Sequence, residues 1–246
     1  MPANHQPYSR ISNANTIVLF VHGIQGSPIQ FRYMISVIPK HIDYMCILLP
    51  GHGETIHSFR SVGKKEWTTY FQSLCHELQK EYNNIYFVGH SLGCLIGIDA
   101  ACSDDVKFSG MLLLACPLRI RLSMRYIRTC YQAIRDKNPS SVYVKAAKDA
   151  NSVFFRSPFE LITCPKPYVG LLLMILQSRH KFKHMTENVC MIHSEKDEIV
   201  SKTSINYIRS MPNGRVVILP ESGHFYYAPS AQKIILQELT ELLNKS

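Results

Sequence analysis

The sequence predicts an α/β fold, with a mostly parallel sheet flanked by helices and a small helical insertion. Two observations carry this prediction. Short apolar runs alternate along the chain with segments of helical periodicity, the order expected of a parallel sheet covered on both faces. The runs are also continuously apolar, as in strands that are buried on both faces; they read IVLFV, CILL, IYFV, MLLLA, VCMI and VVIL.

The first 116 residues predict strands and helices in alternation. We expect strands at 16–21, 45–49, 84–88 and 111–115, and helices at 27–38, 64–82 and 92–102. Pro28 would lie in the first turn of the first helix, where proline is tolerated. The second helix is strongly amphipathic, because large apolar side chains recur at intervals of three and four, at Trp67, Phe71, Leu74, Leu78 and Tyr82.

The alternation of strands and helices stops at Pro117. From there to about His184 the sequence reads as helical and irregular, with no clear strand. We therefore predict a helical cap at 117–184, inserted between two core segments, 1–116 and 185–246. After the insertion the alternation returns, with strands expected at 189–193 and 215–219 and helices at 201–210 and 230–244. Ser230 would be the N-cap of the last helix.

Length and composition set the broad class. The 246 residues fit one domain with an insertion, and the hydrophobic share of 46% and charged share of 18% are typical of a soluble protein with a sizeable core. Residues 1–15 are polar and the apolar runs are too short to cross a bilayer, so we expect no signal peptide. The eight cysteines form no C-x-x-C pair, which indicates reduced cysteines in a cytoplasmic protein.

The formal net charge is +9. One interpretation is attraction to anionic partners such as nucleic acid, acidic lipid or acidic substrates. The other is a generally basic surface with no specific role. No nucleic-acid motif appears, which favours the second interpretation, and we expect no nucleic-acid partner.

The strongest local signal is Gly89-His90-Ser91-Leu92-Gly93, which fits G-x-S-x-G. It directly follows an expected strand and opens an expected helix, as a nucleophile elbow requires. We predict that Ser91 is a nucleophile and that the backbone N–H of Leu92 faces the developing oxyanion. The alternative is a glycine-rich turn with a structural role alone.

A second glycine-containing turn, His22-Gly23-Ile24-Gln25-Gly26, follows the first strand. The tetrahedral intermediate of acyl transfer needs another N–H donor, which a turn after an early strand can supply. We expect Ile24 N–H to be that donor, with Gln25 N–H as the lesser candidate. The alternative is a tight turn shaped only for the helix that follows.

The acid and the base should follow the serine in that order. His224 lies just after the last strand and is the predicted base; the alternative is one exposed loop histidine among eleven. Asp197 is the predicted acid, which would hold the imidazole in its working tautomer. Its neighbours Glu195 and Glu198 are interpreted as solvated loop charges.

Three further histidines receive lesser roles. We expect His90 to pack or hydrogen-bond, the turn Gly51-His52-Gly53 to border the mouth of the site, and His22 to fix loop geometry. None is interpreted as a metal ligand, and no metal or cofactor is expected.

Together these segments resemble the α/β-hydrolase superfamily, and within it the small carboxylesterases and monoacylglycerol-lipase-like hydrolases grouped with the serine aminopeptidases. The matching segments are VLFVHGIQGSP (18–28), LLPGHGET (48–55), VGHSLG (88–93), HSEKDEIV (193–200) and PESGHF (220–225). The resemblance implies an α/β-hydrolase fold in which 117–184 covers the active site. The HG-x-x-GSP motif is similar to that of carboxylesterases acting on short- or medium-chain acyl esters.

The predicted cap begins with a helical stretch that mixes five arginines with apolar residues. The arginines are Arg119, Arg121, Arg125, Arg128 and Arg135, and the apolar residues are Leu118, Ile120, Leu122, Tyr126, Ile127 and Tyr131. One interpretation is a basic amphipathic lid that touches a membrane or an anionic substrate. The other is a lid helix that is apolar beneath and solvated above. The run 168–176 would line an acyl pocket or form plain cap core.

The predicted function is hydrolysis of carboxylic esters, short- to medium-chain acyl or monoacylglycerol-like, through a Ser-His-Asp triad and an acyl-enzyme intermediate. A dehalogenase is disfavoured because its nucleophile would be an aspartate. A peptidase or thioesterase on the same triad and a non-catalytic hydrolase-fold ligand receptor stay open. The expected partners are a small-molecule acyl ester and, weakly, a membrane surface through the basic cap; the sequence leaves the oligomeric state open.

Overall fold

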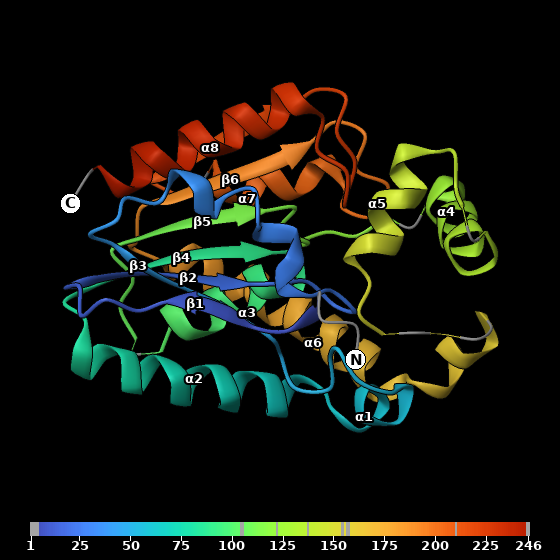
Figure 1. Ribbon diagram of the computed structural model, residues 1–246, viewed down its shortest axis with the longest axis horizontal. Coiled ribbons are helices and arrows are strands. Elements are labelled where there is room, and N and C mark those ends of the chain that lie inside the picture. The colour runs from blue at the N-terminus through green and yellow to red at the C-terminus, as the bar shows by residue number, and fades with distance from the viewer. Residues whose placement is uncertain are drawn as a thin grey trace.

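Strands from along the whole chain assemble into one seven-stranded sheet of order β1-β3-β2-β4-β5-β6-β7 (Figure 1). The computed structural model describes residues 5–103, 106–121, 123–136, 138–153, 155, 158–209 and 211–244. The strands are β1 Tyr8–Arg10, β2 Thr16–Val21, β3 Asp43–Ile47, β4 Asn84–His90, β5 Gly110–Leu114, β6 Val189–Ser194 and β7 Gly214–Leu219. β1 runs antiparallel to β3, and the other neighbouring pairs are parallel. The predicted α/β class with a mostly parallel sheet is therefore confirmed.

The strand order creates a switch point between β2 and β4. From β2 the chain turns to one side, to β3, and then crosses back to β4 on the other side of β2. The two strands pair in register from Thr16 with Asn84 to Val21 with Gly89. Ligands of open α/β sheets bind beyond the carboxyl ends of strands at such a point. The strand order therefore predicts a ligand-binding site beyond the ends of β2 and β4.

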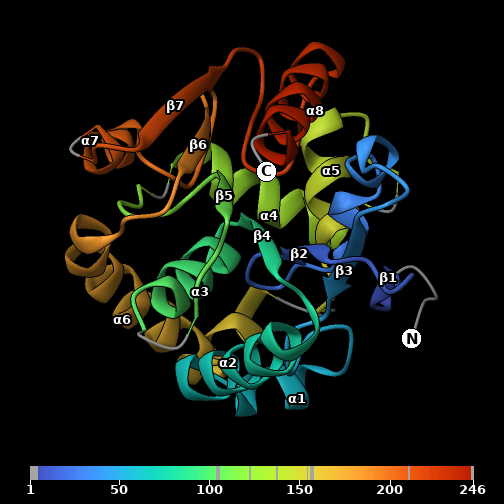
Figure 2. The same ribbon diagram turned by 90° about the vertical axis from the view of Figure 1, so that its left-hand side faces the viewer.

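Helices cover both faces of the sheet (Figure 2). On one face α8 packs with two short 3-10 turns, η2 and η3, over the cluster that includes Phe20, Phe31 and Leu239. On the other face lie α2, α3 and α6. The helices are α1 Ile56–Ser61, α2 Lys64–Glu81, α3 Leu92–Ala101, α4 Met124–Arg135, α5 Val142–Ala150, α6 Pro165–Lys181, α7 Ile205–Ile208 and α8 Pro229–Leu243. The 3-10 turns are η2 Pro28–Phe31, η3 Ile35–Val37, η4 Pro158–Thr163, η5 Phe182–His184 and η6 Lys202–Ser204.

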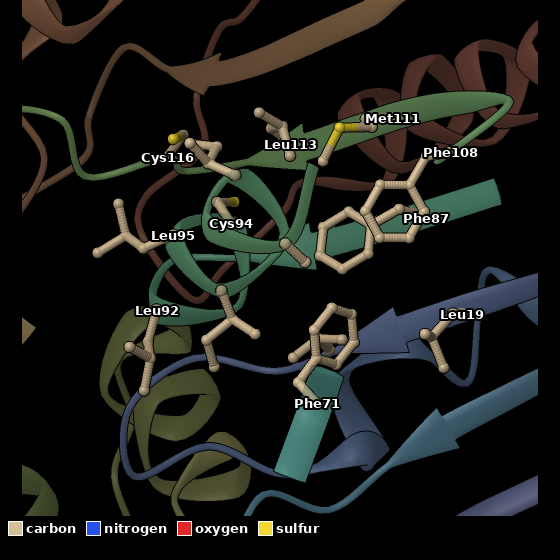
Figure 3. Close-up of a cluster of buried hydrophobic side chains, with 14 of the residues drawn as sticks. Leu19, Phe71, Phe87, Leu92, Cys94, Leu95, Phe108, Met111, Leu113 and Cys116 are labelled. Atoms are coloured by element: carbon tan, nitrogen blue, oxygen red, sulfur yellow. The ribbon is translucent and has the colours of Figure 1, made fainter. Parts of the chain in front are cut away.

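Apart from Asp99, the residues of helix α3 are apolar or glycine and most of them are buried, as expected of a helix in the interior. Figure 3 shows Leu92, Cys94 and Leu95 on this helix, beside a cluster of aromatic rings. The ring centroids of Phe71 and Phe87 lie 5.8 Å apart, and those of Phe87 and Phe108 lie 5.2 Å apart. The turn that precedes α3 therefore rests on a tightly packed base.

Two predicted helices are shorter in the structure than in the prediction. Residues 27–38 form only η2 and η3, because the hydroxyl of Ser27 is hydrogen-bonded to His5 Nδ1 at 2.8 Å and makes no N-cap bond. The segment 27–38 also contains four β-branched residues, which disfavour an α-helix: Ile29, Ile35, Val37 and Ile38. Residues 201–209 form η6 and a single turn, α7, and residue 210 lies outside the described residues.

Two terminal features also differ from the prediction. The predicted N-cap Ser230 is wrong, because α8 begins at Pro229 with Ala228 as its N-cap; proline at the first helical position is preorganised for that place. Strand β1 was not expected, since its three residues, Tyr8 to Arg10, form no apolar run. The remaining predicted strands appear within two residues of their expected ends.

The predicted insertion 117–184 contains two kinds of element. Helices α4 and α5 pack on each other, beyond the end of the sheet in Figure 1. Helix α6 instead packs on α2 and α3, in the layer that covers the sheet. Tertiary packing therefore groups α6 with the core helices, although the sequence pattern groups it with the cap. The predicted cap residue Leu122 lies outside the described residues.

Within the described part of the chain, no helix combines the length and apolar character needed to cross a bilayer.

Candidate active site

Ser91 sits on a strained turn between β4 and α3. Its backbone angles are φ 51° and ψ −115°, a region that residues with a side chain rarely adopt. The turn is held from both sides, because Ser91 N–H donates to the carbonyl of Leu114 at 3.0 Å and Cys94 N–H donates to the carbonyl of Ser91 at 3.0 Å. This is the strand–turn–helix geometry of a nucleophile elbow.

The elbow requires glycine on both sides of the serine. A Cβ on Gly93 would lie 2.0 Å from the carbonyl oxygen of Val21, and one on Gly89 would lie 2.8 Å from the backbone nitrogen of Cys94. Both obstacles are backbone atoms, which cannot move aside as a side chain can. The start of α3 therefore packs directly against the end of β2 and the turn that follows it.

That following turn is fixed by Gln25, which has a positive φ of 59°. Its N–H donates to Nε2 of His52 at 3.0 Å, and its carbonyl accepts the N–H of Ser152 at 2.7 Å. Within the described residues, the N–H groups of Ile24 and Leu92 have no hydrogen-bond acceptor. Of the two predicted donors in this turn, Gln25 is thus occupied and Ile24 is available.

The structure brings Asp197 and His224 together in the interior. Nδ1 of His224 lies 3.0 Å from Oδ2 and 3.2 Å from Oδ1 of Asp197. Oδ1 also accepts the N–H groups of Ile199 and Val200, at 2.9 and 2.7 Å. Because the carboxylate accepts, Nδ1 of His224 carries the proton and Nε2 offers its lone pair.

Burial and pairing act in opposite directions on both groups. Burial alone would raise the pKa of Asp197, but the imidazole of His224 and the N–H groups of Val200 and Ile199 hold it below its ordinary value. Burial would lower the pKa of His224, but the carboxylates of Asp197 and Glu198 raise it above its ordinary value. The pairing therefore favours the imidazolium form of His224.

Glu198 is not the solvated loop charge that the sequence suggested. It is buried, and its Oε2 accepts the backbone N–H of His224 at 3.0 Å. No sequence motif marks it; its position next to Asp197 is the one available signal. Glu195, by contrast, is exposed as expected.

His90 connects the serine turn to the loop that carries His224. Its Nε2–H donates to the backbone carbonyl of His224 at 2.9 Å, and the two imidazole centroids lie 5.0 Å apart. Within the described residues, no hydrogen bond joins the hydroxyl of Ser91 to the imidazole of His224. In enzymes without substrate this bond is often long, and it tightens when substrate binds.

The other two of these histidines, His22 and His52, hold backbone segments in place through hydrogen bonds. Nε2 of His22 accepts the N–H of Leu49 at 3.0 Å, and its Nδ1–H donates to the carbonyl of Gly23 at 2.8 Å. His52 is 1% exposed, and its Nδ1–H donates to the carbonyl of Pro50. Burial lowers the pKa of His22 well below its ordinary value and that of His52 to about 4, so both rings are neutral. Among the described residues, no group of three or more histidine, cysteine or acidic side chains is placed to hold a metal ion.

Solved structures similar to this chain include several hydrolases. A structure from the metagenome-derived lipolytic enzymes LipS and LipT matches with a TM-score of 0.75 at 16% identity, covering 99% of both chains. The monoacylglycerol lipase of Paleococcus ferrophilus matches with a TM-score of 0.71 at 13% identity, covering 98% of both. An E-2-(acetamidomethylene)succinate hydrolase matches with a TM-score of 0.70 at 16% identity, covering 96% of this chain and 94% of that one. At these identities the likeness shows the fold alone.

No curated protein sequence matches the chain. The sequence does match the alpha/beta hydrolase family over residues 18–235, which is most of its length and includes Ser91, Asp197 and His224. The predicted resemblance is therefore confirmed, and the chain belongs to the alpha/beta hydrolase family.

Proposed function

We propose that the protein is a serine esterase with Ser91 as nucleophile, His224 as general base and Asp197 as the acid that orients it. The observation that carries this proposal is the buried His224–Asp197 pair, joined through His90 to the strained turn of Ser91. A serine hydroxyl is a weak nucleophile without a base, and this arrangement supplies one beside the elbow.

In the proposed reaction, the hydroxyl of Ser91 attacks the ester carbonyl and passes its proton to Nε2 of His224. The N–H groups of Ile24 and Leu92 donate to the oxyanion of the tetrahedral intermediate. His224 then protonates the leaving alcohol, and an acyl-enzyme remains on Ser91. Water then loses a proton to Nε2 of His224 and attacks the acyl carbonyl; the bond to Ser91 breaks, His224 returns the proton to the oxygen of Ser91, and the carboxylic acid is released.

The proposed substrates are carboxylic esters with short- to medium-chain acyl groups, or monoacylglycerol-like esters. The HG-x-x-GSP motif supports this class, and so do the lipolytic enzymes and the monoacylglycerol lipase among the similar structures. A peptidase or thioesterase would use the same three residues.

We also propose that the cap makes a weak contact with a membrane surface. Among the described residues, all the large apolar side chains that are strongly exposed lie at 124–176, except Ile11 and Tyr70. On α4, Met124, Ile127 and Tyr131 are exposed, which favours a membrane contact over a lid helix that is apolar beneath and solvated above. The five cap arginines are exposed beside them, which suits an anionic surface.

A second exposed apolar stripe supports the same contact. Val169, Leu172, Leu173 and Leu176 recur on one side of α6 at intervals of three and four and are about half exposed. The run 168–176 is thus neither uniformly buried nor a simple pocket wall. A cytoplasmic location is proposed as well, and it is supported by eight cysteines that form no C-x-x-C pair.

The test is turnover of p-nitrophenyl esters from acetyl to palmitoyl by the purified protein, beside Ser91→Ala. We expect hydrolysis by the wild type, with a chain-length optimum, and loss of activity in the variant. Equal inactivity of both proteins on every ester would contradict the proposal, and amide and thioester substrates would then be tried. Binding of an acyl ester without any turnover would favour a ligand receptor.

A further inference from the structure

The loop between β7 and α8, which carries His224, is held on one side by core residues. Lys196 N–H donates to the carbonyl of Ser222 at 3.0 Å, and the N–H of His224 donates to Oε2 of Glu198 at 3.0 Å. Nε2–H of His90 donates to the carbonyl of His224 at 2.9 Å. These bonds all come from segments at the carboxyl ends of β4 and β6.

One side chain of the predicted insertion reaches the same loop. The hydroxyl of Tyr143, on α5, donates to the carbonyl of Glu221 at 3.1 Å. Among the described residues, no other hydrogen bond joins 117–184 to this loop. Glu221 has a positive φ of 58°, a conformation that residues with a side chain rarely adopt and that surrounding contacts must hold. The hydroxyl of Tyr143 is one of those contacts.

The ring of Tyr143 contacts the loop on both sides of His224. Before the histidine, a Cβ on Gly223 would lie 3.0 Å from Cδ1 of the ring. After it, the ring of Tyr226 packs edge-on, with the two ring centroids 4.9 Å apart. The guanidinium carbon of Arg125, on α4, lies 4.2 Å from the centroid of the Tyr143 ring. Tyr143 therefore joins both cap helices, α4 and α5, to the chain around the proposed base.

Gly223, directly before the base, is packed against the cap and the core. The same Cβ would also lie 2.8 Å from Oε2 of Glu198. The backbone that leads into His224 therefore depends on where Tyr143 lies. The imidazole must come within hydrogen-bonding distance of Ser91 to take its proton. A misplacement of about 1 Å can lower a rate by about 100-fold, so the hold on this loop bears on turnover.

We propose that Tyr143 is a positioning residue, which holds the loop of His224 from the cap so that the imidazole meets Ser91. This inference rests on the proposed esterase function. Tyr143 acts through Glu221 and Gly223, and not on the substrate. If it only packed the cap on the core, its loss would lower stability but leave the turnover of each folded molecule unchanged.

The test compares the wild type with Tyr143→Phe, which removes the hydroxyl and keeps the ring, at a temperature where both are folded. On the p-nitrophenyl ester that the wild type cleaves fastest, kcat should fall by about threefold to tenfold, the effect of one lost hydrogen bond, with KM unchanged. Amide hydrogen exchange of Gly223 and His224, followed by NMR, should speed up by a similar factor, because the loop opens more often.

Tyr207→Phe is the matched control. Its hydroxyl also joins the core to the predicted insertion, since it accepts from Nε of Arg119 at 3.5 Å, but it does not touch the loop of the base. This variant should keep the wild-type kcat and the wild-type exchange of Gly223 and His224.

Three results would overturn the proposal while the wild type is active. They are an unchanged kcat in Tyr143→Phe, an unchanged exchange of the two loop amides, and an equal loss of kcat in Tyr207→Phe. A wild type that hydrolyses no ester, amide or thioester would instead overturn the proposed function, and this inference with it.

Discussion

Glu198 and His224 are joined through the backbone: Oε2 of the glutamate accepts the N–H of the histidine at 3.0 Å. The adjacent Asp197 accepts Nδ1–H from the ring of the same histidine at 3.0 Å. Two consecutive carboxylates on one turn therefore hold both the main chain and the side chain of the proposed base. The close contact also requires Gly223, whose Cβ would lie 2.8 Å from Oε2 of Glu198.

Replacing Glu198 by glutamine should separate its hydrogen bond from its charge. Glu198→Gln keeps an acceptor for the N–H of His224 but removes a carboxylate that raises the pKa of this imidazole. We expect most of kcat to survive, with the acid limb of the pH profile of kcat/KM shifted to lower pH. Glu198→Ala should lose about 1–3 kcal/mol of stability, because the N–H is left unpaired. An unchanged pH profile in Glu198→Gln would contradict this role.

The pH dependence of ester hydrolysis should report the proposed base. His224 accepts a proton only when neutral, so kcat/KM should rise with pH through a pKa above the ordinary 6.5. Asp197→Asn removes the main group that raises this pKa, so the acid limb of the kcat/KM profile should move to lower pH. The value of kcat should fall by about 10⁴-fold. Stopped-flow or plate assays from acid to neutral pH measure both effects. An acid limb with an apparent pKa at or below 6.5 in the wild type would contradict the proposed effect of Asp197 on His224.

The strain at Ser91 predicts a difference between two inactive variants. Its φ of 51° favours glycine, whereas alanine keeps the steric conflict of a Cβ. Ser91→Gly should therefore be more stable than Ser91→Ala, by about 1 kcal/mol or more. Chemical denaturation of the two variants tests this, with loss of ester hydrolysis expected in both. Equal stability would show that the turn is not strained in solution.

Close packing of α3 on β2 predicts that Gly93→Ala fails to fold normally. The added Cβ would lie 2.0 Å from the carbonyl oxygen of Val21, so the two backbones must separate. Gly110→Ala is the matched control, because its Cβ would meet the mobile end of the Leu242 side chain at 2.7 Å. We expect a loss of more than about 3 kcal/mol in the first variant and a smaller loss in the second. Comparable denaturation midpoints would refute the distinction.

The proposed membrane contact predicts binding to anionic vesicles that falls with added salt. Arg128→Glu on α4 should weaken binding to phosphatidylserine vesicles at least about fivefold, since one basic side chain contributes about 1 kcal/mol there. Ile127→Ser, which removes an exposed apolar side chain, should weaken it as well. Tyr70→Ser changes an exposed residue away from the cap and serves as the control. Cosedimentation that is the same for all four proteins would exclude the cap as the contact.

Sequence patterns predicted the parallel sheet because its buried strands are continuous apolar runs. The positions of Ser91, Asp197 and His224 could likewise be predicted, since each follows a strand at the same edge of the sheet. The structure adds that Asp197 and His224 are in contact. Their catalytic roles, and those of Ile24 and Leu92, remain predictions that the assays above test.

Other features could not be predicted because they depend on long-range contacts. Glu198 looks like any loop carboxylate until the fold places His224 against it. The sequence predicts a helix at 27–38 with Pro28 in its first turn, but the hydroxyl of Ser27, which could cap it, is hydrogen-bonded to His5 instead. Helix α6 lies within the predicted cap in sequence, and only its packing on α2 and α3 groups it with the core helices.

The backbone of Gln25 is fixed by residues that the chain reaches much later. Ser152, just after α5, donates through its N–H to the carbonyl of Gln25 and through its hydroxyl to that of Gly26 at 2.6 Å. Tyr168, on α6, is hydrogen-bonded to the side chain of Gln25. The predicted insertion is therefore not a module that can be exchanged freely. A chimera in which another sequence replaces 117–184 would need a serine-like hydrogen-bond donor at this place to hold the turn beside Ser91.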